Sequence, residues 1–240
     1  MLFAAGLGTR LRPLTDHMPK ALVPVGGRPL LDITASRLRA AGVTEMVINV
    51  HHFSDQIIDY VNTHDMGMQV SISDETDALL DTGGGLKKAL KAFSSDDNSH
   101  ILIHNVDILS NADLQQFYET NQDVDVALMV SPRKTQRYLL FDDDMRLVGW
   151  TNIATGEVRS PYDNLDVSKC KMFAFSGIHV VSPTLSADMQ SWPDAFPIMD
   201  FYLKNCDHLF IRGVVKEDLR LLDVGKQDTL TAAEEFLQTI

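Results

Sequence analysis

Residues that could do chemistry are concentrated near the amino end of this sequence, where two glycines are followed by three cations. Gly6 and Gly8 come directly after a short apolar run, and Arg10, Arg12 and Lys20 follow them. Glycine lets backbone N–H groups approach an anion closely, and the cations neutralise its charge. The spacing matches neither GxxxxGK[ST] nor GxGxxG, so it is not typical of a P-loop or of a dinucleotide site. We expect this loop to bind a polyphosphate.

Two aspartates stand where apolar runs end. Asp107 follows ILIHNV, and Asp223 follows LRLL. In an α/β fold the carboxyl ends of the parallel strands share one edge of the sheet, and ligands bind at that edge. An aspartate at the end of a strand can also cap a turn, so both interpretations stay open at this point.

Further glycines mark two other places. The run at 83–85 precedes an expected helix over 84–93, and such a run can form a tight turn or bring the backbone close to a ligand. Gly177 lies inside an expected strand over 172–181, which indicates close approach by a ligand or by another backbone segment. The eight histidines show no metal-binding spacing.

The composition is that of an ordinary globular protein, with 45% hydrophobic and 22% charged residues in 240. The formal net charge of −12 argues against nucleic acid and anionic membranes as partners. No apolar run approaches the ~20 residues of a membrane span, and the start does not resemble a signal peptide, so we expect a cytoplasmic protein. Cys170 and Cys206 lie far apart without a CxxC motif and are expected to be reduced thiols.

The elements that must position these residues follow from the hydrophobic pattern. Strands and helices alternate at βα spacing up to residue 104, which predicts an α/β fold with a Rossmann-like, doubly wound, mostly parallel mixed sheet. Short strands from about residue 124 predict a small antiparallel addition, and 151–171 is expected to be a long loop. No linker divides the chain, so we expect a single domain over 1–240. The expected strands are 1–5, 43–50, 68–73, 101–104, 124–130, 138–141, 147–150, 172–181, 209–214 and 219–222, and the expected helices are 29–41, 55–64, 84–93, 184–190, 197–206 and 226–237.

The run AAGLGTRLRPLT followed by PKALVPVGGRPLL resembles the signature of sugar-1-phosphate nucleotidyltransferases, and the similarity extends over nearly the whole chain. The resemblance implies Mg²⁺-dependent transfer of a nucleotidyl group from an NTP to a sugar 1-phosphate. Arg10 and Lys20 would be the catalytic cations, and Arg12 either a phosphate ligand or a structural partner of a carboxylate. The triphosphate would bind at Ala5, Gly6, Gly8 and Thr9, and the metal at Asp107 and Asp223.

The segment LDTGGG resembles the ETGGG run of uridylyltransferases that act on N-acetylmuramate 1-phosphate, with Asp81 in place of the glutamate. Mannose-1-phosphate guanylyltransferases more often have GTAG there. The resemblance therefore favours UTP and an N-acetylmuramate-like sugar 1-phosphate, a reaction of nucleotide-sugar and cell-wall synthesis, with GTP and mannose 1-phosphate as the alternative. The base-side residues it implies are Asp81, Thr82, Gly83 and Gly84.

On the sugar side, the resemblance implies contacts from Asn105 and Gly177. The family's NGD reads Asn105-Val106-Asp107 here, and the Glu-Lys-Pro whose lysine binds the sugar phosphate is missing. Lys169 and Lys171 lie nearby, but their spacing selects neither. A non-catalytic sensor of nucleotide sugars is the alternative from another class, and it would be expected to lose the cations or carboxylates that this chain retains. We expect a monomer or small homo-oligomer whose partners are an NTP and a sugar 1-phosphate.

Overall fold

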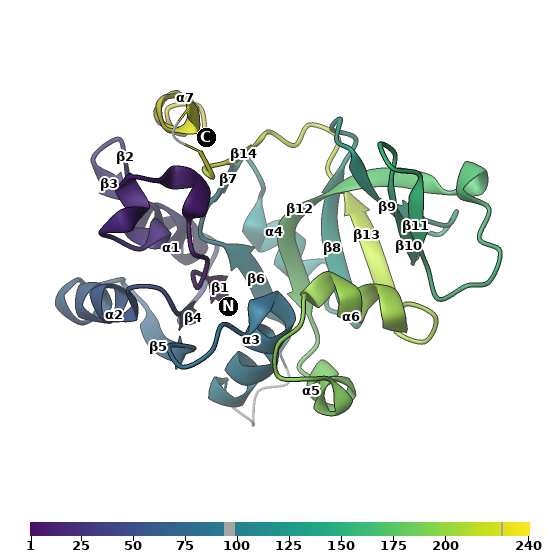
Figure 1. Cartoon of the computed structure of the whole chain (residues 1–240), viewed down its shortest axis with the longest axis horizontal. Coiled ribbons are helices and arrows are strands. Elements are labelled where there is room, and N and C mark those ends of the chain that lie inside the picture. The colour runs from purple at the N-terminus through teal and green to yellow at the C-terminus, as the bar shows by residue number, and fades with distance from the viewer. Residues whose placement is uncertain (94–98, 227) are drawn as a thin grey trace.

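The computed structural model describes residues 1–93, 99–226 and 228–240, and its main feature is one ten-stranded sheet with helices on both sides (Figure 1). The sheet follows the order β11-β10-β9-β12-β6-β1-β4-β5, and β8 and β13 join it beside β12. Its strands are β1 (Leu2–Phe3), β4 (Glu45–Val50), β5 (Gln69–Asp74), β6 (Ile101–Asn105), β8 (Val126–Ser131), β9 (Arg137–Phe141), β10 (Leu147–Asn152), β11 (Glu157–Arg159), β12 (Lys171–Val181) and β13 (Ile211–Val215). Two small ribbons pair β2 (Pro24–Val25) with β3 (Arg28–Pro29) and β7 (Ile108–Ser110) with β14 (Leu221–Asp223).

Strands β5, β4, β1 and β6 are parallel neighbours, as the βα spacing predicted. Leu2 lies opposite Ile48 on one side and His104 on the other. This register places the carboxyl ends of the four strands at one edge of the sheet, and the glycine loop leaves β1 at the same edge. The prediction of a Rossmann-like, mostly parallel mixed sheet is confirmed.

Helices cover both faces because the buried strand residues alternate between two hydrophobic clusters. In β4, Met46 and Ile48 belong to one cluster and Val47 to the other. The first cluster takes side chains from α1 (Leu30–Ala40), α2 (Ser54–Thr63), α4 (Leu114–Glu119) and α7 (Asp228–Leu237). The second takes them from α3 (Asp81–Ala89), α5 (Leu185–Asp188) and α6 (Ile198–Asn205). Burial on both faces explains why the central strands are apolar without alternation.

The antiparallel addition is also confirmed, and it is built on β12. The first residues of β12 pair with β9, and its last residues lie between β6 and β8. Its register with β8 shifts between Phe175 and His179, and Gly177 sits in this bulge with φ +79°. The predicted loop over 151–171 includes the short strand β11, which pairs with β10 at the far edge of the sheet (Figure 1).

Other differences from the predicted elements are local. Helix α3 begins at Asp81, so the glycine run lies inside the helix rather than before it. Strand β7 and helix α4 were not predicted. The predicted closing helix from 226 includes position 227, which lies outside the described residues, and α7 is described from Asp228. Within the residues described, no helix has the length and apolarity needed to cross a membrane.

Candidate active site

A cavity of about 480 Å³ opens at the carboxyl edge of the parallel strands, where the predicted residues meet. It is enclosed by the ends of β1 and β6, the glycine loop and the segment between β5 and α3. Ten of the predicted site residues line it: Ala5, Gly6, Gly8, Thr9, Arg10, Lys20, Asp81, Thr82, Asn105 and Asp107. The fold therefore brings together residues that are up to about a hundred positions apart in the chain.

The glycine loop presents free backbone amides to this cavity. Gly8 has φ +63°, and a Cβ atom there would lie 2.8 Å from Thr15 Cγ2, so both the conformation and the space require glycine. The Gly8 carbonyl accepts hydrogen bonds from the Thr15 hydroxyl (2.8 Å) and the Leu11 amide (2.9 Å). Among the described residues, the amides of Gly6 and Leu7 have no acceptor. Adjacent amides without protein acceptors are available to bind an anion.

Lys20 holds the two strand-end carboxylates together. Its ammonium forms an ion pair with Asp107 and lies 3.9 Å from Asp223 Oδ1. The Lys20 side chain is only 10% exposed, against 19% for Asp107 and 47% for Asp223. Arg10 reaches the same cluster, with a guanidinium nitrogen 3.6 Å from Asp223 Oδ2. Two cations and two carboxylates thus meet beside the glycine loop.

The β7–β14 ribbon explains why two aspartates so far apart in sequence are adjacent. Asp223 pairs with Ile108, the residue after Asp107, and the Val224 amide donates to the Asp107 carbonyl at 2.9 Å. Gly225 follows, where a Cβ atom would lie 2.7 Å from the Arg10 guanidinium. The glycine at 225 therefore leaves room for the observed positions of the Arg10 and Asp223 side chains.

The donor set of this cluster fits a magnesium ion. The carboxylate oxygens of Asp107 and Asp223 already converge on one cation, the Lys20 ammonium. Over the ranges that the structure describes, no group of three or more His, Cys, Asp or Glu side chains is placed to hold a metal. The protein would therefore supply two oxygen ligands and leave the other positions to phosphate oxygens and water, which is the coordination Mg²⁺ favours.

Two polar residues that the sequence did not single out, Asn49 and Glu75, support the floor of the cavity. Asn49 accepts from the Ala4 amide at 2.8 Å and donates to Glu75 Oε1 at 2.8 Å. Glu75 Oε2 accepts from the Leu80 amide at 3.2 Å. Burial raises the pKa of Glu75 above its usual value. In the sequence, each is only a polar residue near the end of an expected strand. Many turns have the same pattern, so it did not identify them.

Gly83 and Gly84, two of the predicted base-side residues, have a packing role in the structure. A Cβ atom at Gly84 would lie 1.9 Å from the Asp194 carbonyl oxygen, and one at Gly83 would lie 2.3 Å from the Phe196 ring. The amides of both glycines donate to the Phe196 carbonyl, and neither residue lines the cavity. The glycines therefore allow α3 to pack closely against the segment before α6.

The neighbouring pair Asp81 and Thr82 does line the cavity. Asp81 has φ +59°, and its carboxylate accepts from the Thr82 amide at 2.6 Å. The Thr82 hydroxyl accepts from the Ile198 amide at 2.9 Å. These bonds fix the start of α3 at the rim of the cavity.

Gly177, which the resemblance puts on the sugar side, lies against Asn105 and does not line the cavity. A Cβ atom at Gly177 would come within 2.8 Å of Asn105 Nδ2, so the glycine makes room for that side chain. Arg12 forms an ion pair with Asp16 at 3.2 Å, which matches the structural alternative left open for it.

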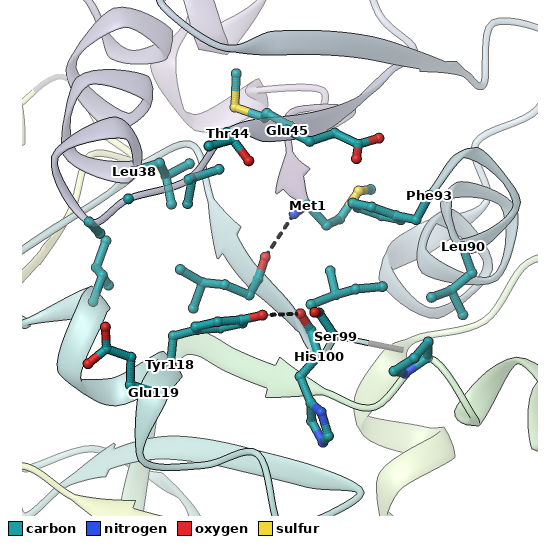
Figure 2. A pocket seen from close by; sticks show the side chains of 18 of the residues that line it. Met1, Leu38, Thr44, Glu45, Leu90, Phe93, Ser99, His100, Tyr118 and Glu119 are labelled. Carbon is teal, nitrogen blue, oxygen red and sulfur yellow. Dashed lines mark hydrogen bonds between the residues drawn. The ribbon is translucent and has the colours of Figure 1, made fainter. Parts of the chain in front are cut away.

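A larger cavity, about 690 Å³, lies at the opposite edge of the parallel strands (Figure 2). It surrounds Met1, whose amine donates to the Leu102 carbonyl at 2.8 Å, and includes Tyr118, whose hydroxyl donates to the His100 carbonyl at 2.9 Å. It contains neither the glycine loop nor the strand-end carboxylates. Size alone would favour this cavity as the active site, but the glycine loop, the cations and Asp107 line the smaller one.

The chain is similar to known nucleotidyl transferases. The sequence model described as "Nucleotidyl transferase" matches residues 1–138. An N-acetylmuramate alpha-1-phosphate uridylyltransferase from Caulobacter vibrioides is 31% identical over 99% of this chain and 96% of that protein. A mannose-1-phosphate guanyltransferase from Emericella nidulans is 34% identical over 50% of this chain and 33% of that protein. The crystal structure of HddC from Yersinia pseudotuberculosis has a TM-score of 0.76 at 23% identity and covers 98% of this chain and 97% of that chain.

These matches, with the glycine loop and the fold, show that the chain belongs to the nucleotidyl transferase family. Its activity is that of a sugar-1-phosphate nucleotidyltransferase.

Proposed function

We propose that this enzyme transfers the uridylyl group of UTP to an N-acetylmuramate-like sugar 1-phosphate, releasing pyrophosphate and forming a UDP-sugar. The observation that supports this choice is the extent of similarity. The Caulobacter uridylyltransferase matches along 99% of this chain and 96% of its own length. The mannose-1-phosphate guanyltransferase of Emericella nidulans matches only 50% of the chain, and GTP with mannose 1-phosphate is the second candidate pair.

The reaction needs no activated side-chain nucleophile, because a phosphate oxygen of the sugar 1-phosphate is already anionic at pH 7. That oxygen forms a bond to the α-phosphorus of UTP, and the bond from the α-phosphorus to the bridging oxygen breaks, with its electron pair leaving on pyrophosphate. The main requirement is to hold two polyanions in line and to neutralise the charge of the leaving group.

The residues around the cavity fit these tasks. The amides of Gly6 and Leu7 bind the triphosphate, and the guanidinium of Arg10 binds the departing pyrophosphate. Lys20 neutralises phosphate oxygens next to Asp107. Asp81 and Thr82 face the base. Asp107 and Asp223 would hold Mg²⁺, which would further neutralise the phosphate charge.

The test is a matrix of the four NTPs against the 1-phosphates of N-acetylmuramate, N-acetylglucosamine and mannose, monitored by pyrophosphate release with and without Mg²⁺. We expect the highest kcat/KM for UTP with N-acetylmuramate 1-phosphate and no turnover in EDTA. Preference for GTP and mannose 1-phosphate would replace this proposal with the second candidate. Absence of turnover with every pair would contradict catalysis itself.

A further inference from the structure

Arg133 is placed next to the bulge of β12 on the sugar side of the site. It follows the end of β8 by two residues, and its guanidinium donates to the Phe175 carbonyl at 2.9 Å. Phe175 is the last residue of β12 that pairs with β8 before the register shifts. Gly177, two residues further on, lies against Asn105 of the candidate active site.

The sheet register puts Arg133 at the same edge as the reacting groups. Strand β12 is antiparallel to both β6 and β8, so β6 and β8 run in the same direction and their carboxyl ends, Asn105 and Ser131, face the same side. A step of two residues along a strand is about 7 Å. The guanidinium is therefore held roughly that far along β12 from the residue that contacts Asn105, outside the triphosphate loop and on the sugar side.

Several other cations of this half of the chain have a carboxylate partner. Five such ion pairs are formed by Arg159–Asp200, Lys169–Asp166, Lys171–Asp143, Arg212–Asp123 and Lys216–Asp218. These pairs also account for Lys169 and Lys171, the two lysines that the sequence left as candidates for a sugar-side cation.

Arg133, like Lys134, Arg137, Arg146, Lys204 and Arg220, is not among these five. Across the described parts of the chain, no carboxylate lies within ion-pair distance of its guanidinium. The hydrogen bond to Phe175 holds the exposed group in place and uses only part of its donor capacity, since a guanidinium has five N–H donors. In a protein of net charge −12, a positioned arginine without a carboxylate partner suits an anionic group of a ligand.

We infer that Arg133 binds the lactyl carboxylate of the sugar substrate and thereby selects a muramate-type sugar 1-phosphate over neutral hexosamines and hexoses. This inference rests on the proposed function. A planar guanidinium matches a carboxylate through two parallel hydrogen bonds. Neither mannose nor N-acetylglucosamine has a carboxylate. The charge of Arg133 would therefore select among sugar substrates. The binding of UTP would depend on the glycine loop instead.

The test compares Arg133→Gln with Lys134→Gln. The second variant removes a neighbouring exposed charge from the same segment between β8 and β9. The two substrates are N-acetylmuramate 1-phosphate and its lactyl amide, which has the same shape without the charge. A hydrogen-bonded charge pair corresponds to about a tenfold to a hundredfold effect. We expect Arg133→Gln to raise the KM for the acid by at least about tenfold and to leave the KM for the amide and for UTP unchanged. Lys134→Gln should match the wild type, and Arg133→Lys should fall between.

The outcomes separate this inference from the proposed function. If the wild type uses the acid and the amide equally well, or if Arg133→Gln raises both KM values by the same factor, Arg133 only supports the bulge and the inference is wrong while the proposed function stands. If the wild type uses no muramate-type substrate with UTP, the proposed function fails and the inference fails with it.

Discussion

The Lys20–Asp107 ion pair provides the sharpest test of how the candidate active site is built. Lys20→Met removes the ammonium but keeps a long apolar side chain, and it leaves Asp107, 19% exposed, without its cation. Asp107→Asn conversely leaves a 10% exposed ammonium with Asp223 at 3.9 Å as its remaining partner. Removing one partner of a largely buried pair destabilises by about 3 kcal/mol.

For a chain of this size, 1 kcal/mol corresponds to roughly 2–4 °C in Tm. We therefore expect each single variant to unfold about 6–12 °C below the wild type in thermal denaturation followed by circular dichroism in EDTA. Replacing both members of a buried pair is close to neutral, so Lys20→Met/Asp107→Asn should recover most of the loss. Single variants within about 2 °C of the wild type, or a double variant as low as the summed losses, would refute this account.

The same variants test whether the ammonium and Mg²⁺ use the same carboxylates. In the wild type, an added cation has to share Asp107 and Asp223 with Lys20. Millimolar MgCl₂ should therefore raise the Tm of Lys20→Met more than that of the wild type, because a ligand stabilises the state that binds it. Asp107→Asn is the control and should show little shift. Equal shifts in all three proteins would mean that Mg²⁺ does not bind at these carboxylates.

Two further predictions concern the glycines and the buried histidines. Gly84→Ala should lower the Tm by several degrees because its Cβ would lie 1.9 Å from the Asp194 carbonyl, whereas Gly6→Ala, with nothing within 4 Å, should keep the Tm and raise the KM for the NTP. An unchanged Tm for Gly84→Ala would contradict the packing role. Burial lowers the pKa of His104 to about 4 and that of His179 to about 3, below the unfolded value of about 6.5. Only the unfolded chain then takes up these protons as the pH falls from 6.5 towards 4, so the free energy of unfolding should decrease over that range in urea titrations. His179→Leu should flatten the decrease, and an unchanged slope would mean that His179 does not contribute to it.

The sequence alone was sufficient to predict the features that depend on residues close together along the chain. The apolar runs and their βα spacing predicted the parallel sheet, and the helix expected over 29–41 lies at Leu30–Ala40 in the structure. The position of Asp107 at the end of an apolar run predicted its place at the carboxyl edge. Such patterns are local, so they can be recognised without knowing which segments pack against them.

Contacts between distant segments were decided only by the tertiary structure. The sequence left the glycine run at 83–85 as either a tight turn or a ligand contact. In the structure, the lack of side chains at Gly83 and Gly84 allows close packing against Phe196 and Asp194, more than a hundred residues later. The hydrogen bonds of Asn49 and the position of Arg133 against Phe175 likewise depend on how neighbouring strands are aligned. The spacing of residues in the sequence indicates which of them can share a face of a strand or helix. The register between strands decides which of them are in contact. For this protein, the amino-acid pattern therefore determined the sheet and the type of chemistry, and the packing of distant segments determined which residues line the candidate active site.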